Sequence, residues 1–329
     1  MKKHIIFTAL AINMFLLSSC KLDKENPLDA SQTEPEEEVS LPSIYGNYVD
    51  GSYARRNEGY DWVGVRVQNG NEGQIQVQVR SRADKKRPTC TFDATAFMIS
   101  DSTYQALVDG KQVMFSFANK KLTISTEPQD ENVLYFYCSG GATVAGTYDK
   151  IEEDLDTFQV DKTSFSKVLR LQDVGFNISS IEKGENNTLT IIPFGLDEDN
   201  GPVTLNIYGQ VVGAEIEDLN SDGSPEIVVY TQSDGSGSYG NVIGYSVNNK
   251  KTMSPIFFPS TAENNSINQG YMGHDEFNLI ETNLVQRFPI YNPQDSNAEP
   301  TGGIRQISYK LKEGENGRYF EINSVSEFK

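Results

Sequence analysis

The amino-acid sequence predicts an all-β fold organised as two successive antiparallel β domains. Three observations support this prediction. Apolar and polar residues alternate over many short stretches, as they do in strands that bury one face. Segments rich in glycine and asparagine separate these stretches at short, even spacing. The chain after its first twenty residues does not show the longer apolar period of an amphipathic helix.

Composition narrows the functional classes. The chain has 329 residues, a length that suggests about two domains, and 37% of them are hydrophobic, which is enough for a packed core. Its 46 acidic and 28 basic side chains give a formal charge of −18, which repels a phosphate backbone, so we expect no nucleic-acid partner. The two histidines, His4 and His274, argue against a zinc site built from several histidines and against a histidine-based triad.

The N-terminus has the pattern of a secretion signal over residues 1–19. Two lysines precede an apolar run that ends at Leu17 and is too short to span a bilayer. The segment Leu17-Ser18-Ser19-Cys20 resembles the lipobox of bacterial lipoproteins. This resemblance implies that Cys20 is acylated and becomes the first residue of the mature protein.

The same resemblance implies a location. In that family an aspartate after the cysteine is the usual signal for retention in the inner membrane, whereas Lys21 stands here. We therefore expect an outer-membrane lipoprotein that faces the periplasm or the cell surface. Removing the two signal lysines from the 28 basic side chains leaves 26 against 46 acidic ones, so the mature chain has a charge of −20.

Residues 20–43 are predicted to be an acidic linker behind the lipidated cysteine. Acidic side chains and three prolines dominate this stretch, and apolar residues are few. Such a composition cannot offset the entropy lost on ordering the backbone. Its charge keeps the linker extended, so that it holds the folded part away from the membrane surface.

The remaining cysteines predict a disulfide. If Cys20 carries the lipid, Cys90 and Cys138 are the two cysteines left in an oxidising compartment. A bond between them would stabilise the first domain by about 4 kcal/mol in the chain-entropy model. A reactive thiol would instead need a nearby base, and the sequence offers none.

Residues 44–151 are predicted to form the first domain, an antiparallel barrel or sandwich. Its end, Cys138 to Ala142 followed by Gly146-Thr147-Tyr148, resembles the closing segment of small secreted β-barrel domains of unknown role. That resemblance implies a small barrel and nothing about function. The expected strands contain these alternating apolar positions: Val63, Val65 and Val67; Ile75, Val77 and Val79; Val113, Phe115 and Phe117; Leu122 and Ile124; Leu134, Phe136 and Cys138.

Residues 160–329 are predicted to form the second β domain, after an acidic connector at residues 152–156. The strand pattern starts near Phe165 and continues to the C-terminus. A long loop over residues 231–241 joins two of the strands, and Thr282-Asn283 is expected to be a two-residue hairpin turn. The clearest expected strands are Val203–Ile207, Glu226–Tyr230, Val242–Val247, Phe277–Glu281 and Leu284–Tyr291.

The first candidate site is an acidic turn before the long loop. Asp218, Asn220, Asp222 and Glu226 surround a glycine, in the pattern of the front half of a calcium loop. The glutamate that would close a twelve-residue loop is replaced by Val229, and no helix is expected beside the motif. A plain turn stabilised by Asp and Asn side chains is the alternative, so calcium stays a possible cofactor and no other is expected.

The second candidate site is the long loop itself. Its glycines allow the backbone to take positive φ angles and to project Ser236, Ser238 and Tyr239 away from the sheet; they are Gly235, Gly237 and Gly240. An exposed tyrosine loses little entropy when it docks and supplies much contact area. The alternative is a flexible glycine-serine loop that has no partner.

Ser236-Gly237-Ser238-Tyr239 resembles the Ser-Gly-x-Tyr loop of the periplasmic inhibitors of invertebrate-type (i-type) lysozymes. The resemblance covers about half of the chain, from Phe165 to Lys329. It implies a β-sandwich whose loop enters the substrate cleft of lysozyme, with Ser236 and Tyr239 as contact residues. Further matching segments are Asp218–Glu226, Gly273–Phe277, Arg287–Tyr291, Pro300–Gly303 and Arg305-Gln306.

Physical chemistry is consistent with such a partner. Lysozymes cleave with two carboxyl groups across a groove shaped for sugar rings. The Ser236 hydroxyl can donate to one carboxyl group, and the Tyr239 ring can fill an apolar subsite. Many lysozymes are basic, so a strongly acidic protein would be steered toward them, more weakly as salt rises. The membrane is the other expected partner, through the lipid.

We expect no enzymatic activity. His274-Asp275-Glu276 places an imidazole beside two acids, but neighbouring residues on a strand point to opposite faces, and no nucleophile motif accompanies the histidine. The main alternative function is a non-catalytic surface module that binds glycans or calcium and shares the inhibitor fold without its activity.

Overall fold

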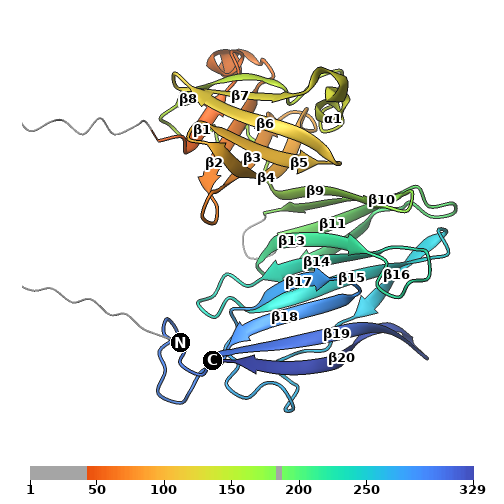
Figure 1. Cartoon of the computed structure of the whole chain (residues 1–329). Helices are drawn as coiled ribbons and strands as arrows, with labels where there is room; N and C mark the ends of the chain where they lie inside the picture. Colours follow the sequence, from red (N-terminus) through yellow and green to blue (C-terminus); the bar gives the residue numbers. More distant parts are fainter. Residues whose placement is uncertain (1–42, 183–186) are drawn as a thin grey trace, which may run out of the picture. The chain divides into compact units, whose positions relative to one another are not determined.

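The computed structural model describes residues 43–182 and 187–329. The signal, Cys20 and nearly all of the acidic linker lie outside these ranges. The described part is all-β, as predicted, with strands organised in one closed barrel and two further sheets (Figure 1). Within the described ranges, no helix has the length and apolarity needed to cross a membrane.

The first eight strands form the closed barrel, in which each strand pairs antiparallel with the next and β8 returns to β1. Their apolar faces alternate inward, so that Val65, Val77, Phe115 and Leu122 are fully or almost fully buried. The strands are β1 (Gly46–Val49), β2 (Val63–Asn69), β3 (Gln74–Ser81), β4 (Thr91–Ser100), β5 (Thr103–Val108), β6 (Lys111–Ala118), β7 (Lys121–Thr126) and β8 (Gly146–Ile151), with 3-10 turns η1 (Tyr53–Glu58) and η2 (Pro128–Asp130).

The strand expected around Leu134, Phe136 and Cys138 is wrong. A short helix, α1 (Asn132–Tyr135), occupies this segment directly after η2. Leu134 is fully buried in the barrel core, and Tyr137, three residues later, packs against the same core. A spacing of three residues is typical of a helix, whereas the strand prediction assumed that the alternate residues 134, 136 and 138 face the core.

The predicted disulfide is confirmed. Cys90 and Cys138 are bonded, with their Cα atoms 4.1 Å apart and a sequence separation of 48. The two residues also form an isolated antiparallel bridge. The bond therefore ties the segment that contains α1 to the edge of β4 and closes the end of the barrel.

The acidic connector after β8 is packed onto the barrel rather than free. Leu155 is buried with Val49, Tyr53 and Trp62 in a small satellite core. A Cβ atom at Gly64 would lie 2.8 Å from the Leu155 side chain, so this glycine permits the close contact. The chain therefore leaves the barrel along a defined path.

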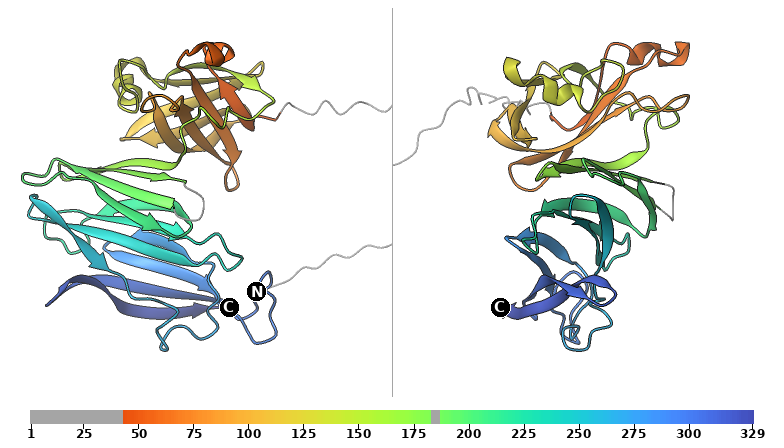
Figure 2. Two further views of the ribbon diagram at one scale, coloured as in Figure 1. Left: turned by 180° about the vertical axis from the view of Figure 1, so that it is seen from behind. Right: turned by 90° about the vertical axis from the view of Figure 1, so that its right-hand side faces the viewer.

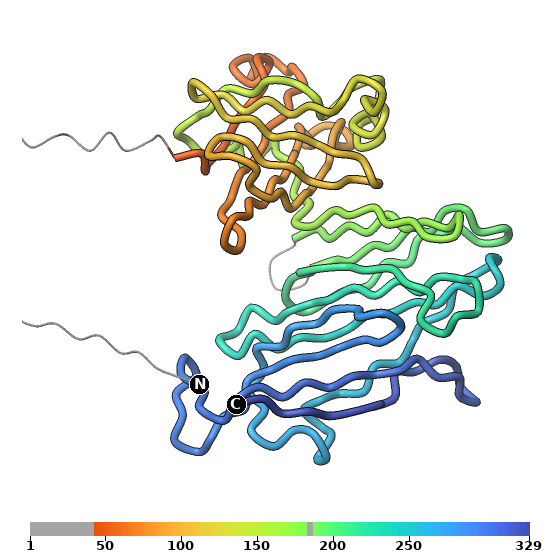
Figure 3. The backbone as a smooth tube through the Cα atoms, in the orientation of Figure 1, coloured from red at the N-terminus to blue at the C-terminus, as the bar shows by residue number. Residues whose placement is uncertain are grey.

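The second half contains a four-stranded sheet, in the order β12-β11-β10-β9, and an eight-stranded sheet, in the order β13-β14-β15-β16-β20-β19-β18-β17. The tube in Figure 3 follows them from green to blue. Their bounds are β9 (Thr163–Leu171), β10 (Val174–Ile181), β11 (Asn187–Phe194), β12 (Val203–Ile207), β13 (Gln210–Glu217), β14 (Glu226–Gln232), β15 (Gly240–Asn248), β16 (Thr252–Phe257), β17 (Glu276–Ile280), β18 (Asn283–Pro289), β19 (Ile304–Gly314) and β20 (Gly317–Phe328).

The eight-stranded sheet has a core on each face. The four-stranded sheet covers one face of β13 to β16 (Figure 2). Phe176, Ile191 and Ile227 pack together in the core between the two sheets. The other core contains Val228, Phe288 and Tyr309. Strand β14 lies between the two cores, which explains why it is buried along nearly its whole length instead of at alternate positions.

Two details differ from the sequence prediction. The β17–β18 turn is Glu281-Thr282, one residue earlier than expected, and Glu281 adopts a left-handed conformation with φ of 54°. One pairing is parallel, between β16 and β20 over two residue pairs, whereas an antiparallel domain was expected.

Candidate functional site

The candidate site is the loop Ser233–Tyr239, which joins β14 to β15. Inside the loop, the Ser233 amide donates to the Tyr239 carbonyl at 2.9 Å, and the Ser238 amide donates to the Gly235 carbonyl at 2.9 Å. The Tyr239 amide donates to the Ser233 hydroxyl at 2.8 Å. The loop is thus a compact turn with defined backbone geometry.

A second segment of the chain holds the loop from outside. The His274 amide donates to the Gly237 carbonyl at 2.7 Å. The Asn297 side-chain amide donates to the Ser236 carbonyl at 2.7 Å, across 61 residues of sequence. These contacts use backbone oxygens, so they leave the exposed side chains of Ser236 and Tyr239 available, whereas the Ser233 and Ser238 hydroxyls bond within the loop.

The expected positive φ angles at Gly235, Gly237 and Gly240 are wrong: in this loop Ser238 has the positive φ, of 42°, and it is half-buried. Glycines instead permit close packing. A Cβ atom at Gly237 would lie 2.5 Å from the Tyr239 ring. Gly273 has φ of +88°, and a Cβ atom there would lie 2.0 Å from the Gly237 carbonyl oxygen. The Ser-Gly-x-Tyr pattern therefore has a structural reason for its glycine in this protein.

Tyr239 stands on an aromatic support. Its side chain is 47% exposed, and its ring meets the Tyr271 ring edge-on at 5.6 Å between centroids. Tyr271 in turn packs against buried Phe288 at 4.7 Å. The exposed ring is thus connected through Tyr271 to the hydrophobic core, which limits its rotation.

Asp275 is the buried anchor of this site. Its carboxylate accepts hydrogen bonds from the Gly240 amide at 2.8 Å, the Tyr271 hydroxyl at 2.7 Å and the Gln286 side chain at 2.6 Å. Burial raises the pKa of Asp275, and the same hydrogen bonds act in the opposite direction. One carboxylate therefore fixes both the start of β15 and the ring beneath Tyr239.

The structure separates the residues of the His274-Asp275-Glu276 motif. His274 has φ of 58°, and its Nε2 lies 3.3 Å from the Asn297 side-chain oxygen. Asp275 points into the buried network, and Glu276 is exposed. The histidine and the aspartate do not form a hydrogen-bonded pair within the described ranges.

The acidic turn has a different design. Asp218 accepts from the Asp222 amide at 3.0 Å and from the Gly223 amide at 2.9 Å. Asn220 accepts from the Asp222 amide at 3.1 Å, and Asp222 accepts from the Ser224 amide at 2.8 Å. The side-chain oxygens that were candidate calcium ligands therefore stabilise the turn itself.

Glu226, the fourth candidate ligand, is completely buried. It accepts hydrogen bonds from the Leu219 amide at 2.7 Å and from the Ser246 hydroxyl. Burial raises its pKa to about 7, although both hydrogen bonds favour the charged form. In residues 43–182 and 187–329, no three His, Cys, Asp or Glu side chains are grouped so that they could hold a metal ion.

Sequence reasoning missed the supporting residues Tyr271, Asp275 and Asn297. The sequence places Asp275 beside His274 and inside the matching segment Gly273–Phe277 but does not indicate a buried anchor, and nothing local distinguishes Asn297 from other loop asparagines. The sequence signal available was the pair of glycines around Tyr271, Gly270 and Gly273, because glycine favours tight turns. In the structure both glycines have positive φ angles.

Comparison with known proteins adds little. No protein-family model matches the chain, and no curated protein matches it. An endo-1,4-β-xylanase from Bacteroides thetaiotaomicron shares 10% identity over 85% of this chain and 94% of that chain, with a TM-score of 0.32. The catalytic domain of a GH62 α-L-arabinofuranosidase from Coprinopsis cinerea shares 10% identity over 82% and 89%, with a TM-score of 0.27. At these scores neither likeness bears on fold or function.

Proposed function

We propose that this protein binds and inhibits lysozyme, i-type in preference, by inserting the loop of Ser236, Gly237, Ser238 and Tyr239 into the active-site cleft. One observation supports this most. Neighbouring residues hold the backbone of the loop, while the Ser236 and Tyr239 side chains are exposed. The proposal also relies on the resemblance of this loop and its flanking segments to the i-type inhibitors.

Such an arrangement suits an inhibitor because binding costs less when the inserted segment is already ordered. A free glycine-serine loop would lose backbone entropy on docking. Here the hydrogen bonds from His274 and Asn297 are present before any partner arrives. The supported Tyr239 ring loses little rotamer freedom on docking.

The exposed groups match the chemistry of a lysozyme cleft. The Ser236 hydroxyl has no hydrogen-bond partner among the described residues and is free to donate to a catalytic carboxylate. The Tyr239 ring supplies flat apolar area for a sugar subsite. The net negative charge of the chain favours encounter with a basic enzyme.

Inhibition of cell-wall lysis by a panel of lysozymes tests the proposal with the full chain. We expect Ser236→Ala and Tyr239→Ala each to weaken inhibition of an i-type enzyme by about thirtyfold, or about 2 kcal/mol. Tyr208→Ala is the matched control, because Tyr208 is 84% exposed in the turn between β12 and β13. That change should leave inhibition unaltered.

Two results would overturn the proposal. One is a folded protein that inhibits none of the lysozymes. The other is inhibition that survives the combined loss of Ser236 and Tyr239. The lipid on Cys20 stays a separate prediction, tested by the mass of the N-terminal peptide from membrane fractions.

A further inference from the structure

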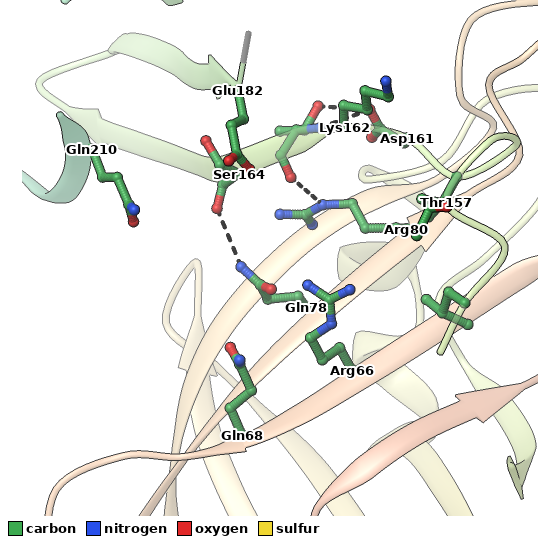
Figure 4. Close-up of a pocket in the computed structure, with 13 residues that line it drawn as sticks. Arg66, Gln68, Gln78, Arg80, Thr157, Asp161, Lys162, Ser164, Glu182 and Gln210 are labelled. Atoms are coloured by element: carbon green, nitrogen blue, oxygen red, sulfur yellow. Dashed lines mark hydrogen bonds between the residues drawn. The ribbon is translucent and has the colours of Figure 1, made fainter. Parts of the chain in front are cut away.

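A polar cleft of about 570 Å³ lies away from the loop, between the outer surface of the barrel and the start of the second half. Strands β2 and β3 supply one wall, and the segment from residue 157 to 164 together with β13 supplies the other (Figure 4). Its size falls within the range of ordinary ligand sites.

Hydrogen bonds fix the two walls against each other. Arg80 Nε donates to the Thr163 carbonyl at 2.6 Å, and the Gln78 side chain donates to the Ser164 carbonyl at 3.2 Å. The Arg80 guanidinium also binds both carboxylate oxygens of Asp93, at 2.5 and 3.0 Å. Asp93 in turn accepts from the Ser166 amide at 2.7 Å. The cleft is therefore a built feature with rigid polar walls.

Several polar groups in the cleft have no partner within the described part of the chain. The Arg66 guanidinium forms no ion pair or hydrogen bond with any described residue, although the chain carries 46 acidic side chains. The side-chain amides of Gln68 and Gln210 are likewise unengaged among those residues, and Gln78 keeps its carbonyl oxygen free. In Figure 4 these four side chains point into the space between the walls.

Charge favours an anion next to Arg66. Lys162 and Arg80 also line the cleft, and Arg80 is neutralised by Asp93. The two carboxylates that line the cleft, Asp161 and Glu182, both keep their negative charge, and Asp161 is turned toward the Thr91 and Thr163 hydroxyls, from which it accepts at 2.8 Å each. Neither carboxylate forms an ion pair with Arg66, so among the described residues the Arg66 guanidinium has no bound anion. A guanidinium fork is suited to bidentate binding of a carboxylate.

The remaining groups favour hydroxyl ligands. Amide side chains both donate and accept, as neighbouring sugar hydroxyls require. No aromatic ring is found among the described residues that line the cleft, so a neutral sugar would have no ring to stack on. Recognition must therefore come from charge and hydrogen bonds.

We propose that this cleft binds an acidic saccharide, with the sugar carboxylate on Arg66 and hydroxyl groups on the amides of Gln68, Gln78 and Gln210. This inference goes beyond lysozyme inhibition and uses none of the loop residues. It gives barrel strands β2 and β3 a part in a binding site that is separate from the loop.

Titration calorimetry of the full chain with trigalacturonate tests the inference. We expect binding that falls by about tenfold or more in Arg66→Gln, because a hydrogen-bonded charge pair is lost. Arg87→Gln is the matched control, since Arg87 is also an exposed barrel arginine with no partner among the described residues but lies outside the cleft. The fully methyl-esterified trisaccharide, which lacks the charge, should bind at least as weakly to the unaltered protein.

Other outcomes overturn the inference. Absence of binding does so, as does equal binding by Arg66→Gln or by the methyl ester. Equal binding of triglutamate would show that the cleft recognises any carboxylate rather than a saccharide. Arg66→Gln should leave lysozyme inhibition unaltered, and Tyr239→Ala should leave trigalacturonate binding unaltered, so the two proposals fail separately.

Discussion

The acidic turn at Asp218–Glu226 and the loop at Ser233–Tyr239 flank the same strand, β14, yet they use their polar groups in opposite ways. In the turn, side-chain oxygens accept from the backbone amides of the turn itself. In the loop, residues far away in sequence bind the backbone oxygens. The candidate ligand side chains of the turn therefore stabilise the turn, while the loop has its backbone supported and leaves the Ser236 and Tyr239 side chains exposed.

Glycine contacts show the same difference. Gly223 in the turn has φ of +82°, and a Cβ atom there would have no neighbouring atom within 4 Å. Gly273, beneath the loop, has a similar φ of +88°, but a Cβ atom there would lie 2.0 Å from the Gly237 carbonyl oxygen. The two positions share a backbone conformation and differ in packing, which allows the two effects to be measured separately.

The largest expected effect comes from this glycine pair. Gly273→Ala should lower the free energy of unfolding by about 3 kcal/mol, because its methyl group would displace the loop, and should abolish lysozyme inhibition. Gly223→Ala should cost only about 1 kcal/mol for the left-handed backbone and leave inhibition intact. Denaturant unfolding and lysis assays measure both. Equal losses in the two variants would contradict the comparison.

A smaller effect is expected from pH, through the buried carboxyl at the end of the turn. The pKa of Glu226 is about 7 in the folded protein against an ordinary 4.5, so the folded state holds this proton more tightly than the unfolded chain does. The stability that the bound proton contributes is complete below pH 4.5 and is lost as the pH rises through 7. Between pH 5 and pH 8 the free energy of unfolding should fall by about 2 kcal/mol on this account.

Glu226→Gln isolates that effect, because the amide oxygen can accept from the Leu219 amide while the amide NH2 donates to the Ser246 hydroxyl oxygen, both without a charge. We expect the variant to lose most of the decrease in unfolding free energy between pH 5 and pH 8. The exposed Glu263→Gln serves as control and should retain it. A pH profile that is the same in the protein with Glu226 and the variant would show that Glu226 titrates normally.

Asp218→Ala should have a more modest effect. It removes the acceptor for the Asp222 and Gly223 amides in an exposed turn, at a cost of about 1 kcal/mol. Lysozyme inhibition should not change, because the loop has its own supports. Asp218→Asn keeps one acceptor oxygen and should lose less stability. Lost inhibition in either variant would show that the turn and the loop are coupled.

Calcium is expected to have the smallest effect. The oxygens of Asp218, Asn220 and Asp222 already accept backbone hydrogen bonds, so any bound calcium would be structural. Adding a chelator should leave lysozyme inhibition unchanged. If titration calorimetry detects tight calcium binding and chelation removes inhibition, the turn is a functional site and the contrast with the loop fails.

The sequence alone was enough to predict the features that depend on local pattern. Alternation at Val63–Val67 and Ile75–Val79 predicted two barrel strands, because one buried face imposes a period of two. Counting cysteines predicted the Cys90–Cys138 bond. The same reasoning failed at Leu134, where helical and alternating spacing cannot be told apart over so few residues.

Tertiary structure decided which of these features could carry function. The anchors of the loop lie 35 residues away at Asp275 and 61 residues away at Asn297, and no local period records such pairings. The cleft at Arg66 likewise needs β2 and β13 to come together, although residues 66 and 210 are distant in sequence. Periodicity reports only the burial of each segment's own face. Long-range hydrogen bonds depend on how separate segments pack, and the sequence by itself left those contacts open.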